Sequence, residues 1–342
     1  MLASHLPAGL ILAISLFLWL PGGAAAPATT AHSDTRPLMG TLVSITVEGG
    51  MPEALREKVD AAYREMQRLS DMMNHYNPDS VVSAINRAAG RQPVTAPREL
   101  MEVLAMARRV SERTGGAFDI TVGALKGWRF NPENPVMPSA QEIAAALPLI
   151  NYRDVILDEK SKTVFLKRPG MRMDLGGIAK LYILNVGMQV LKQQGIAHAM
   201  LNGGGDVVVT GTRAGRPWRI GIRHPRRDGE LLATVELTRG WVVTSGDYER
   251  YFIRDGRRYH HILDPRSGYP PVAGPQQVTL IGEDLSSLNG FSSAIMLLGA
   301  DKGRELIGRL AGVEGLIVAG DGRLWTTPGL EARFQFRRLD RR

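Results

Sequence analysis

Cysteine is absent from this chain of 342 residues. Its absence excludes disulfide bonds, thiolate metal sites, cysteine nucleophiles and a lipid attached to an N-terminal cysteine. Because no disulfide can form by mistake, the composition is compatible with an oxidising compartment.

The chain also has no apolar run of membrane-spanning length near its start. The segment Leu10–Leu20 is shorter than the roughly 20 residues that cross a bilayer as a helix. Pro21-Gly22-Gly23 ends it and alanines follow, which is typical of a secretory signal peptide with a small-residue cleavage site. We therefore predict a signal peptide over residues 1–28, a linker over 29–35 and export to the periplasm, with inner-membrane association if the signal is retained.

Aromatic residues are scarce, at 6% of the chain, and they are not interleaved with the basic residues. The net charge is +8, but the positive charges are scattered and no helix carries the pattern of a nucleic-acid reader. We expect no nucleic-acid partner. Residues 331–342 are predicted to be a solvated basic tail, which holds the densest group of arginines: Arg333, Arg337, Arg338, Arg341 and Arg342.

Helical and strand patterns are present in similar amounts, and short turns join consecutive strands. This favours an α+β fold with mostly antiparallel sheets, as one domain of two lobes over residues 36–330. The expected helices are Pro52–Met73, Val81–Asn86, Pro97–Thr114, Ala140–Leu147, Ile178–Gln194, Leu285–Leu298 and Lys302–Leu310. The expected strands include Leu38–Val47, Val155–Leu157, Thr163–Leu166, Arg172–Leu175, Ala197–Leu201, Val207–Thr210, Trp218–Arg223, Leu232–Leu237 and Trp241–Thr244, with a closing hairpin of Leu316–Ala319 and Leu324–Thr326.

Two glycine-rich turns flank the helix predicted over Ile178–Gln194. The first is Asp174-Leu175-Gly176-Gly177-Ile178-Ala179-Lys180, and the second is Gly203-Gly204-Gly205-Asp206. Amide groups at a helix start favour an anion, glycines allow close approach, and Lys180 adds a point charge. The pattern predicts a phosphate site, although a plain strand-to-helix turn explains it too. It matches neither the Walker loop nor the dinucleotide motif.

A second group of reactive side chains lies in the segment Tyr259–Pro270, where His260 and His261 precede Asp264. An imidazole titrates near neutrality and can act as a general base. The alternative is a strand with one histidine in the core, since a metal site would need a third ligand that spacing does not supply. The turn at Ser245-Gly246-Asp247 could likewise seat a phosphate or lie at the surface.

Together these motifs resemble the ApbE family, the FAD:protein FMN transferases, over about residues 36–330. Their order and spacing make the resemblance specific. The segments that carry it are Met39-Gly40-Thr41, Asn74–Ser80, Ala117-Phe118-Asp119, Asp174–Lys180, Gly203–Asp206, Ser245–Tyr248 and His261–Pro265.

The resemblance implies an ApbE-like, T-fold-related fold and an exported enzyme that uses FAD and Mg²⁺. Such an enzyme transfers FMN from FAD to a Thr or Ser hydroxyl of a partner protein, releases AMP, and acts on a membrane-associated redox subunit. By position, His261 would be the base that activates the hydroxyl. The residues that would contact FAD are Met39, Tyr76, Ala117, Phe118, Asp119, Asp174 and Lys180.

The expected metal ligands depart from the family pattern. The resemblance assigns them to the Gly177 carbonyl, Asn289 and Ser293, and Asn289 stands where the family has an Asp. Since Mg²⁺ prefers charged carboxylates, its affinity should fall unless Asp284 or Glu283 compensates. Two alternatives stay open: a FAD-binding assembly protein with weak transfer activity, and a FAD pyrophosphatase that gives FMN and AMP.

Overall fold

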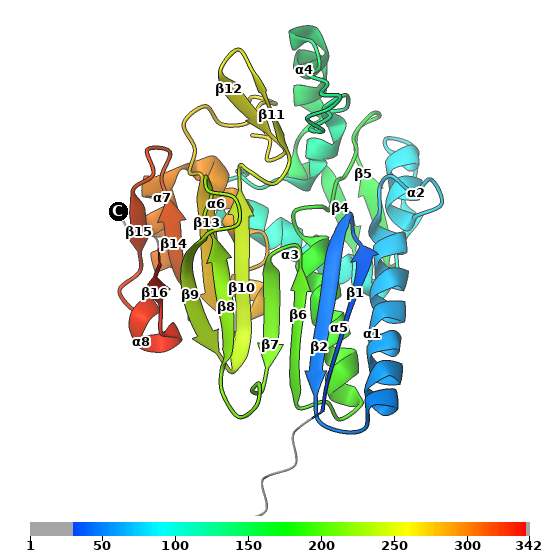
Figure 1. The fold of residues 1–342 in the computed structure, drawn as a ribbon. Helices are drawn as coiled ribbons and strands as arrows, with labels where there is room; N and C mark the ends of the chain where they lie inside the picture. Colours follow the sequence, from blue (N-terminus) through cyan, green and yellow to red (C-terminus); the bar gives the residue numbers. More distant parts are fainter. Residues whose placement is uncertain (1–29, 340–342) are drawn as a thin grey trace, which may run out of the picture.

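An eight-stranded antiparallel sheet forms the centre of the fold in the computed structural model, which describes residues 30–339 (Figure 1). The predicted signal peptide, residues 1–28, and Arg341 and Arg342 lie outside these residues. In spatial order the strands are β1 (Ala31–Leu38), β2 (Thr41–Glu48), β6 (His198–Gly203), β7 (Asp206–Thr210), β10 (Arg239–Gly246), β13 (Gln277–Gly282), β14 (Glu314–Val318) and β15 (Leu324–Thr326).

Helices cover one face of this sheet. Helix α1 spans Pro52–Met73, as predicted, because Leu55, Val59, Met66 and Leu69 form an apolar stripe that is fully buried. It packs along α5 (Ala179–Gln193) behind the sheet in Figure 1. The other helices of the main core are α2 (Val81–Ala88), α3 (Arg98–Arg113), α6 (Phe291–Leu298) and α7 (Ala300–Gly308).

A small sheet covers the opposite face. It consists of β8 (Trp218–Arg223), β9 (Leu231–Leu237) and β16 (Arg337–Arg338). Successive side chains of a strand point to opposite faces of the sheet, so the main sheet contributes to two hydrophobic cores. Val207 and Val209 of β7 lie in a second core under the small sheet, whereas Val208 lies in the main core under the helices.

The predicted solvated tail is therefore wrong up to residue 338. Helix α8 (Leu330–Phe334) buries the side chains of Leu330 and Phe334 in the second core, and β16 pairs with β9. Leu330 and Phe334 are four positions apart, so both lie on the buried face of α8 and hold the segment on the protein. The many arginines of this segment had suggested that all of it is solvated.

Helix α4 (Ala140–Ala146) and the hairpin of β11 (Tyr251–Arg254) and β12 (Arg257–His260) stand beyond the upper edge of the main sheet in Figure 1. The remaining elements are the sheet of β3 (Val94–Thr95), β5 (Thr163–Leu166) and β4 (Val155–Asp158), and the short 3₁₀ turns η1 (Ile120–Ala124), η2 (Leu147–Leu149), η3 (Tyr152–Asp154) and η4 (Leu285–Ser287). The α+β prediction is confirmed. Within residues 30–339, no helix combines the length and the apolarity that a membrane span requires.

Two strand predictions are wrong near the candidate site. The segment Leu38–Val47 is a hairpin rather than one strand, because Met39 and Gly40 turn the chain with φ of 55° and 71°. Its first strand, β1, takes up residues 31–35 of the predicted linker. Residues 172–175 form no strand, since the Asn86 side chain bonds both the N–H and the carbonyl of Met173, at 2.7 and 3.1 Å, in place of a neighbouring strand.

Candidate active site

The register of the main sheet brings several of the predicted site segments to one edge. The turn at Met39 follows β1, and Gly203 pairs with Asp206 across the turn between β6 and β7. The N–H of Gly204 also donates to the carbonyl of Leu42, at 3.2 Å. Strand β10 ends at the same edge, the upper one in Figure 1, where Gly246 pairs with Gln277.

Lys180 lies at this edge, in the first turn of α5, and forms an ion pair with Asp206. Its Nζ is 2.6 Å from Oδ2 of Asp206, whose other oxygen accepts a hydrogen bond from the N–H of Thr244 at 2.9 Å. The Asp206 side chain is only 6% exposed and that of Lys180 is 30% exposed. Asp206 therefore holds the ammonium group in place while leaving it accessible to a ligand.

The turn before α5 uses many of its own amide groups. The carboxylate of Asp174 accepts the N–H of Gly176 at 2.7 Å, and the carbonyl of Leu175 accepts those of Ile178 and Ala179. The predicted row of free amides is therefore largely occupied, and positive charge for an anion comes mainly from Lys180. Gly177 itself is exposed.

Asp174 also faces the segment that carries Tyr76. Its Oδ1 lies 3.4 Å from Nδ1 of His75, and the ring of His75 packs on that of Tyr76 with centroids 3.9 Å apart. Tyr76 as a residue is 79% exposed. An exposed aromatic ring beside the turn that precedes α5 is suited to stack on a flat ligand.

The segment Ala117–Asp119 packs against this turn through Phe118. The Phe118 ring packs on Gly177, where an added Cβ would lie 3.0 Å from it. Asp119 accepts three hydrogen bonds, from the N–H and hydroxyl of Thr121 at 2.8 and 2.6 Å and from the N–H of Tyr152 at 2.8 Å. Burial raises its pKa in spite of these bonds. The Asp119 carboxylate is committed to the fold, so only the backbone and apolar atoms of this segment are left for a ligand.

His261 directly follows β12 and lies close enough to Lys180 for that charge to act on its imidazole. Its N–H donates to the carbonyl of Arg250, while Nδ1 is buried without a hydrogen-bond partner. Burial lowers the pKa of His261 to about 3, with further lowering by the charges of Arg250, His260 and Lys180. The imidazole is therefore neutral at physiological pH, and a negatively charged ligand beside it would raise its pKa and make it a stronger base.

Two of the predicted metal ligands, Gly177 and Asn289, lie close together, but the long helix predicted over Leu285–Leu298 is wrong. Gly290, with φ of 82°, separates η4 from α6, so Asn289 precedes the helix that carries Ser293. The Nδ2 of Asn289 donates to the carbonyl of Ile178 at 2.9 Å, next to Gly177. Ser293 lies 3.1 Å from the hydroxyl of Ser245 at the end of β10.

The predicted ligands are oxygen atoms, which hard cations such as Mg²⁺ prefer, but none of them carries a negative charge. Asn289 Oδ1 is buried and unpartnered, so one amide oxygen is available as a ligand, in addition to the carbonyl and the hydroxyl predicted at Gly177 and Ser293. Asp284 and Glu283, which were suggested to compensate, already have other partners: Asp284 accepts three bonds from Ser286 and Ser287, and Glu283 pairs with Arg239. Residues 30–339 hold no cluster of three acidic, His or Cys side chains suited to a metal.

Comparison with known proteins identifies the family. A model of the ApbE family matches residues 39–317. The chain belongs to the ApbE family. Among its relatives in that family, a FAD:protein FMN transferase of Klebsiella pneumoniae is 38% identical over 84% of this chain and 89% of its own length. Another, from Treponema pallidum, is 30% identical over 90% of this chain and 91% of its own.

Solved ApbE structures have the same fold. The ApbE protein of Thermotoga maritima superposes with a TM-score of 0.81 at 34% identity, over 89% of this chain and 99% of that one. The flavin transferase ApbE of Vibrio cholerae gives 0.77 at 26% identity, over 89% and 99%. The predicted family and fold are therefore confirmed, whereas the role of each site residue stays a prediction.

Sequence reasoning missed two partners within this ApbE site. Asp206 was part of a recognised turn, but nothing in the sequence indicated that its carboxylate would hold Lys180. His75 was part of a recognised motif, yet its contact with Asp174 joins residues far apart in the chain. Only the folded arrangement could reveal either pair.

Proposed function

We propose that this protein transfers FMN from FAD to a Thr or Ser hydroxyl of a partner protein, with Mg²⁺. The observation that carries the proposal is the pairing of Lys180, held by Asp206, with a neutral His261 within reach of its charge. One is suited to bind a phosphate and the other to take a proton, and the activity named for the K. pneumoniae and T. pallidum relatives needs both.

In the proposed reaction the acceptor oxygen attacks the phosphorus on the FMN side of the diphosphate. A new P–O bond forms, the bond to AMP breaks with its electron pair on AMP, and the hydroxyl proton passes to His261. A hydroxyl is a weak nucleophile, so a positioned base is needed. Lys180 orients the diphosphate and balances the charge that develops on it.

FAD would lie across the edge of the main sheet. Tyr76 stacks on a ring of the flavin nucleotide, Asp174 accepts hydrogen bonds from it, and Met39 and the segment Ala117–Phe118 line its apolar side. The Gly177 carbonyl, Asn289 and Ser293 would hold Mg²⁺, which would neutralise charge on the phosphates. Since none of these ligands is charged, the diphosphate itself must supply the negative charge that the ion requires.

The acceptor is proposed to be a membrane-associated redox subunit, met in the periplasm. The apolar segment before residue 28 supports export, and the absence of cysteine suits that compartment. The pyrophosphatase alternative needs the same residues, with water in place of the acceptor hydroxyl.

Mass spectrometry can test the proposal. The purified protein is incubated with FAD, MgCl₂ and a library of threonine and serine peptides, and nucleotide products are followed by chromatography. We expect peptides that carry FMN as a phosphoester, with AMP formed in equal amount, and no product with His261→Ala. Free FMN and AMP at the same rate with or without peptides would instead establish hydrolysis. Bound FAD without any product would support the assembly protein.

A further inference from the structure

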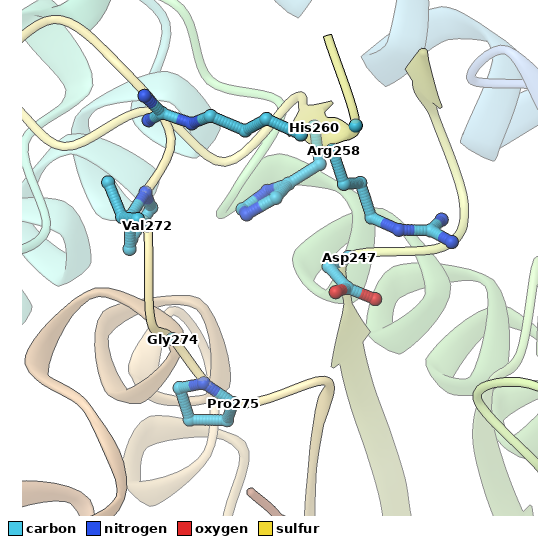
Figure 2. A pocket seen from close by; sticks show the side chains of 9 residues that line it. Asp247, Arg258, His260, Val272, Gly274 and Pro275 are labelled. Carbon is cyan, nitrogen blue, oxygen red and sulfur yellow. The ribbon is translucent and has the colours of Figure 1, made fainter. Parts of the chain in front are cut away.

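A groove lies beside the candidate active site and is lined by none of the residues proposed to bind FAD or Mg²⁺. It has a volume of about 790 Å³, within the range of ligand-binding clefts. An adjoining cavity of about 370 Å³ shares Asp247, Arg258, Val272, Gly274 and Pro275 with it, so the two form one continuous depression. Figure 2 shows Asp247, His260 and Val272 around the smaller cavity, on three separate segments of chain.

The position of the groove relates it to the acceptor rather than to FAD. His260 lines the smaller cavity, and the next residue is His261. Asp247 lies two residues beyond Ser245, whose hydroxyl contacts Ser293. None of the residues proposed to contact FAD lines either cavity. A molecule in the groove would therefore approach the base from a side that FAD leaves open.

The carboxylates that line the groove are already neutralised. Each has an arginine partner: Asp247 binds Arg226 through two contacts of 2.7 and 2.6 Å, Asp301 lies 3.3 Å from Arg304, and Asp321 lies 2.6 Å from Arg323. The acidic residues of the lining thus leave little net negative charge.

Three cations of the lining lack a carboxylate partner in the part of the chain that the structure describes: Arg257, Arg258 and Lys302. Arg258 stacks over the ring of Tyr251, with its Cζ 3.6 Å from the centroid, and its Nη1 is buried without an acceptor. Lys302 is exposed at the start of α7 and forms no ion pair within residues 30–339. A buried donor without an acceptor costs free energy, which an incoming carboxylate or carbonyl would recover.

The rim of the groove is apolar. Val272 is 81% exposed, on a loop that prolines stiffen on both sides, at Pro271 and Pro275. A side chain this exposed on a rigid loop can contact an apolar residue of a partner at low entropic cost.

We propose that this groove binds an acidic, extended segment of the acceptor protein and so delivers its hydroxyl to His261. The inference rests on the proposed transfer to a protein hydroxyl and adds the chemistry of the segment that surrounds it. Carboxylates of the segment pair with Arg258 and Lys302, and an apolar residue rests on Val272.

Two fluorescein-labelled threonine peptides test the proposal, one rich in Asp and one with Asn at the same positions. Fluorescence anisotropy measures their binding to the full protein. We expect the acidic peptide to bind at least about tenfold more tightly, and Arg258→Gln and Lys302→Gln each to remove about tenfold, as the loss of one charge-assisted contact does. Arg219→Gln, an exposed arginine on β8, is the matched control and should change nothing.

A second readout keeps the groove distinct from the flavin site. Quenching of flavin fluorescence should give the same FAD affinity for Lys302→Gln as for the unchanged protein. Equal binding of the two peptides, or full binding by both variants, would refute the acidic partner. A matching loss of FAD affinity would assign the groove to FAD. If no peptide ever receives FMN, the proposed function fails, while anisotropy still decides what the groove binds.

Discussion

Asn289 shows how one side chain can change what a site requires. Its Nδ2 donates to the carbonyl of Ile178, a bond that a carboxylate at this position could not make. The amide thus joins the turn before α5 to the start of α6 without an ion. A carboxylate at this position would need a cation to hold the same two oxygens together.

Asn289→Asp should therefore make stability depend on Mg²⁺. Without the ion, the new carboxylate faces a carbonyl, and we expect a loss of about 1–3 kcal/mol in the free energy of unfolding. Millimolar Mg²⁺ should restore much of this loss, as urea denaturation with EDTA or MgCl₂ would show. Asn202→Asp is the control, because Asn202 uses its oxygen to accept the N–H of Gly205. The same stability with and without Mg²⁺ would contradict the role of Asn289.

Two aspartates of the site should respond oppositely to replacement by alanine. Asp119→Ala strands three buried donors, so we expect a loss of about 3 kcal/mol in stability. Asp174→Ala removes a half-exposed carboxylate and should weaken FAD binding about tenfold while it lowers the melting temperature little. Thermal melts and flavin titrations of both variants distinguish the roles, and the reverse pattern would make Asp174 the structural residue.

Acid should destabilise the protein through its two adjacent histidines. Burial lowers the pKa of His260 to about 4 and that of His261 to about 3, below the usual 6.5. The unfolded chain therefore takes up protons first, and stability present above pH 6.5 is lost as the pH falls toward 4. At pH 5 the loss is about 2 kcal/mol for each histidine.

Urea denaturation at pH 7 and pH 5 would measure this loss, and His260→Asn should remove the share that His260 contributes. Groups common to both proteins cancel in the comparison. An unchanged difference between the two pH values would mean that His260 is protonated in the folded state.

Among the elements, the break between η4 and α6 depends on a glycine. Gly290 has φ of 82°, and a Cβ there would lie 3.1 Å from Ile178 and 3.3 Å from Val110. We expect Gly290→Ala to cost about 2 kcal/mol or more in stability and to displace Asn289. Gly308→Ala, where a Cβ meets nothing within 4 Å, should be neutral or mildly stabilising. Denaturant midpoints of the two variants provide the test.

The elements also show where local patterns suffice. Helix α1 was predicted to the residue, because its apolar stripe repeats over many turns. The apolar pattern of Leu285–Leu298 predicts one helix, yet Gly290, in the left-handed backbone conformation, separates it into η4 and α6. Residues 172–175 look like a strand, but the Asn86 amide takes the place of a neighbouring strand. Periodicity reports which face is buried, and it does not report which backbone groups find partners far along the chain.

The candidate site was predictable as a set of residues but not as an arrangement. Motif resemblance identified Lys180, Asp174 and His261, while their partners Asp206, His75 and Arg250 required the fold. The same holds for the groove, since no local pattern predicts that Nη1 of Arg258 would lie buried without an acceptor in a cavity that Val272 also lines.

The order of strands in the main sheet has a consequence for synthesis of the protein. Strand β2 pairs with β6, and the residues that meet at the upper edge range from Met39 to Ser293. A chain emerging from the ribosome therefore cannot assemble this edge until nearly all of it has been made. Incomplete chains that contain only the early motifs would therefore not bind the nucleotide. Binding of flavin would then indicate that the whole chain has been made and has folded.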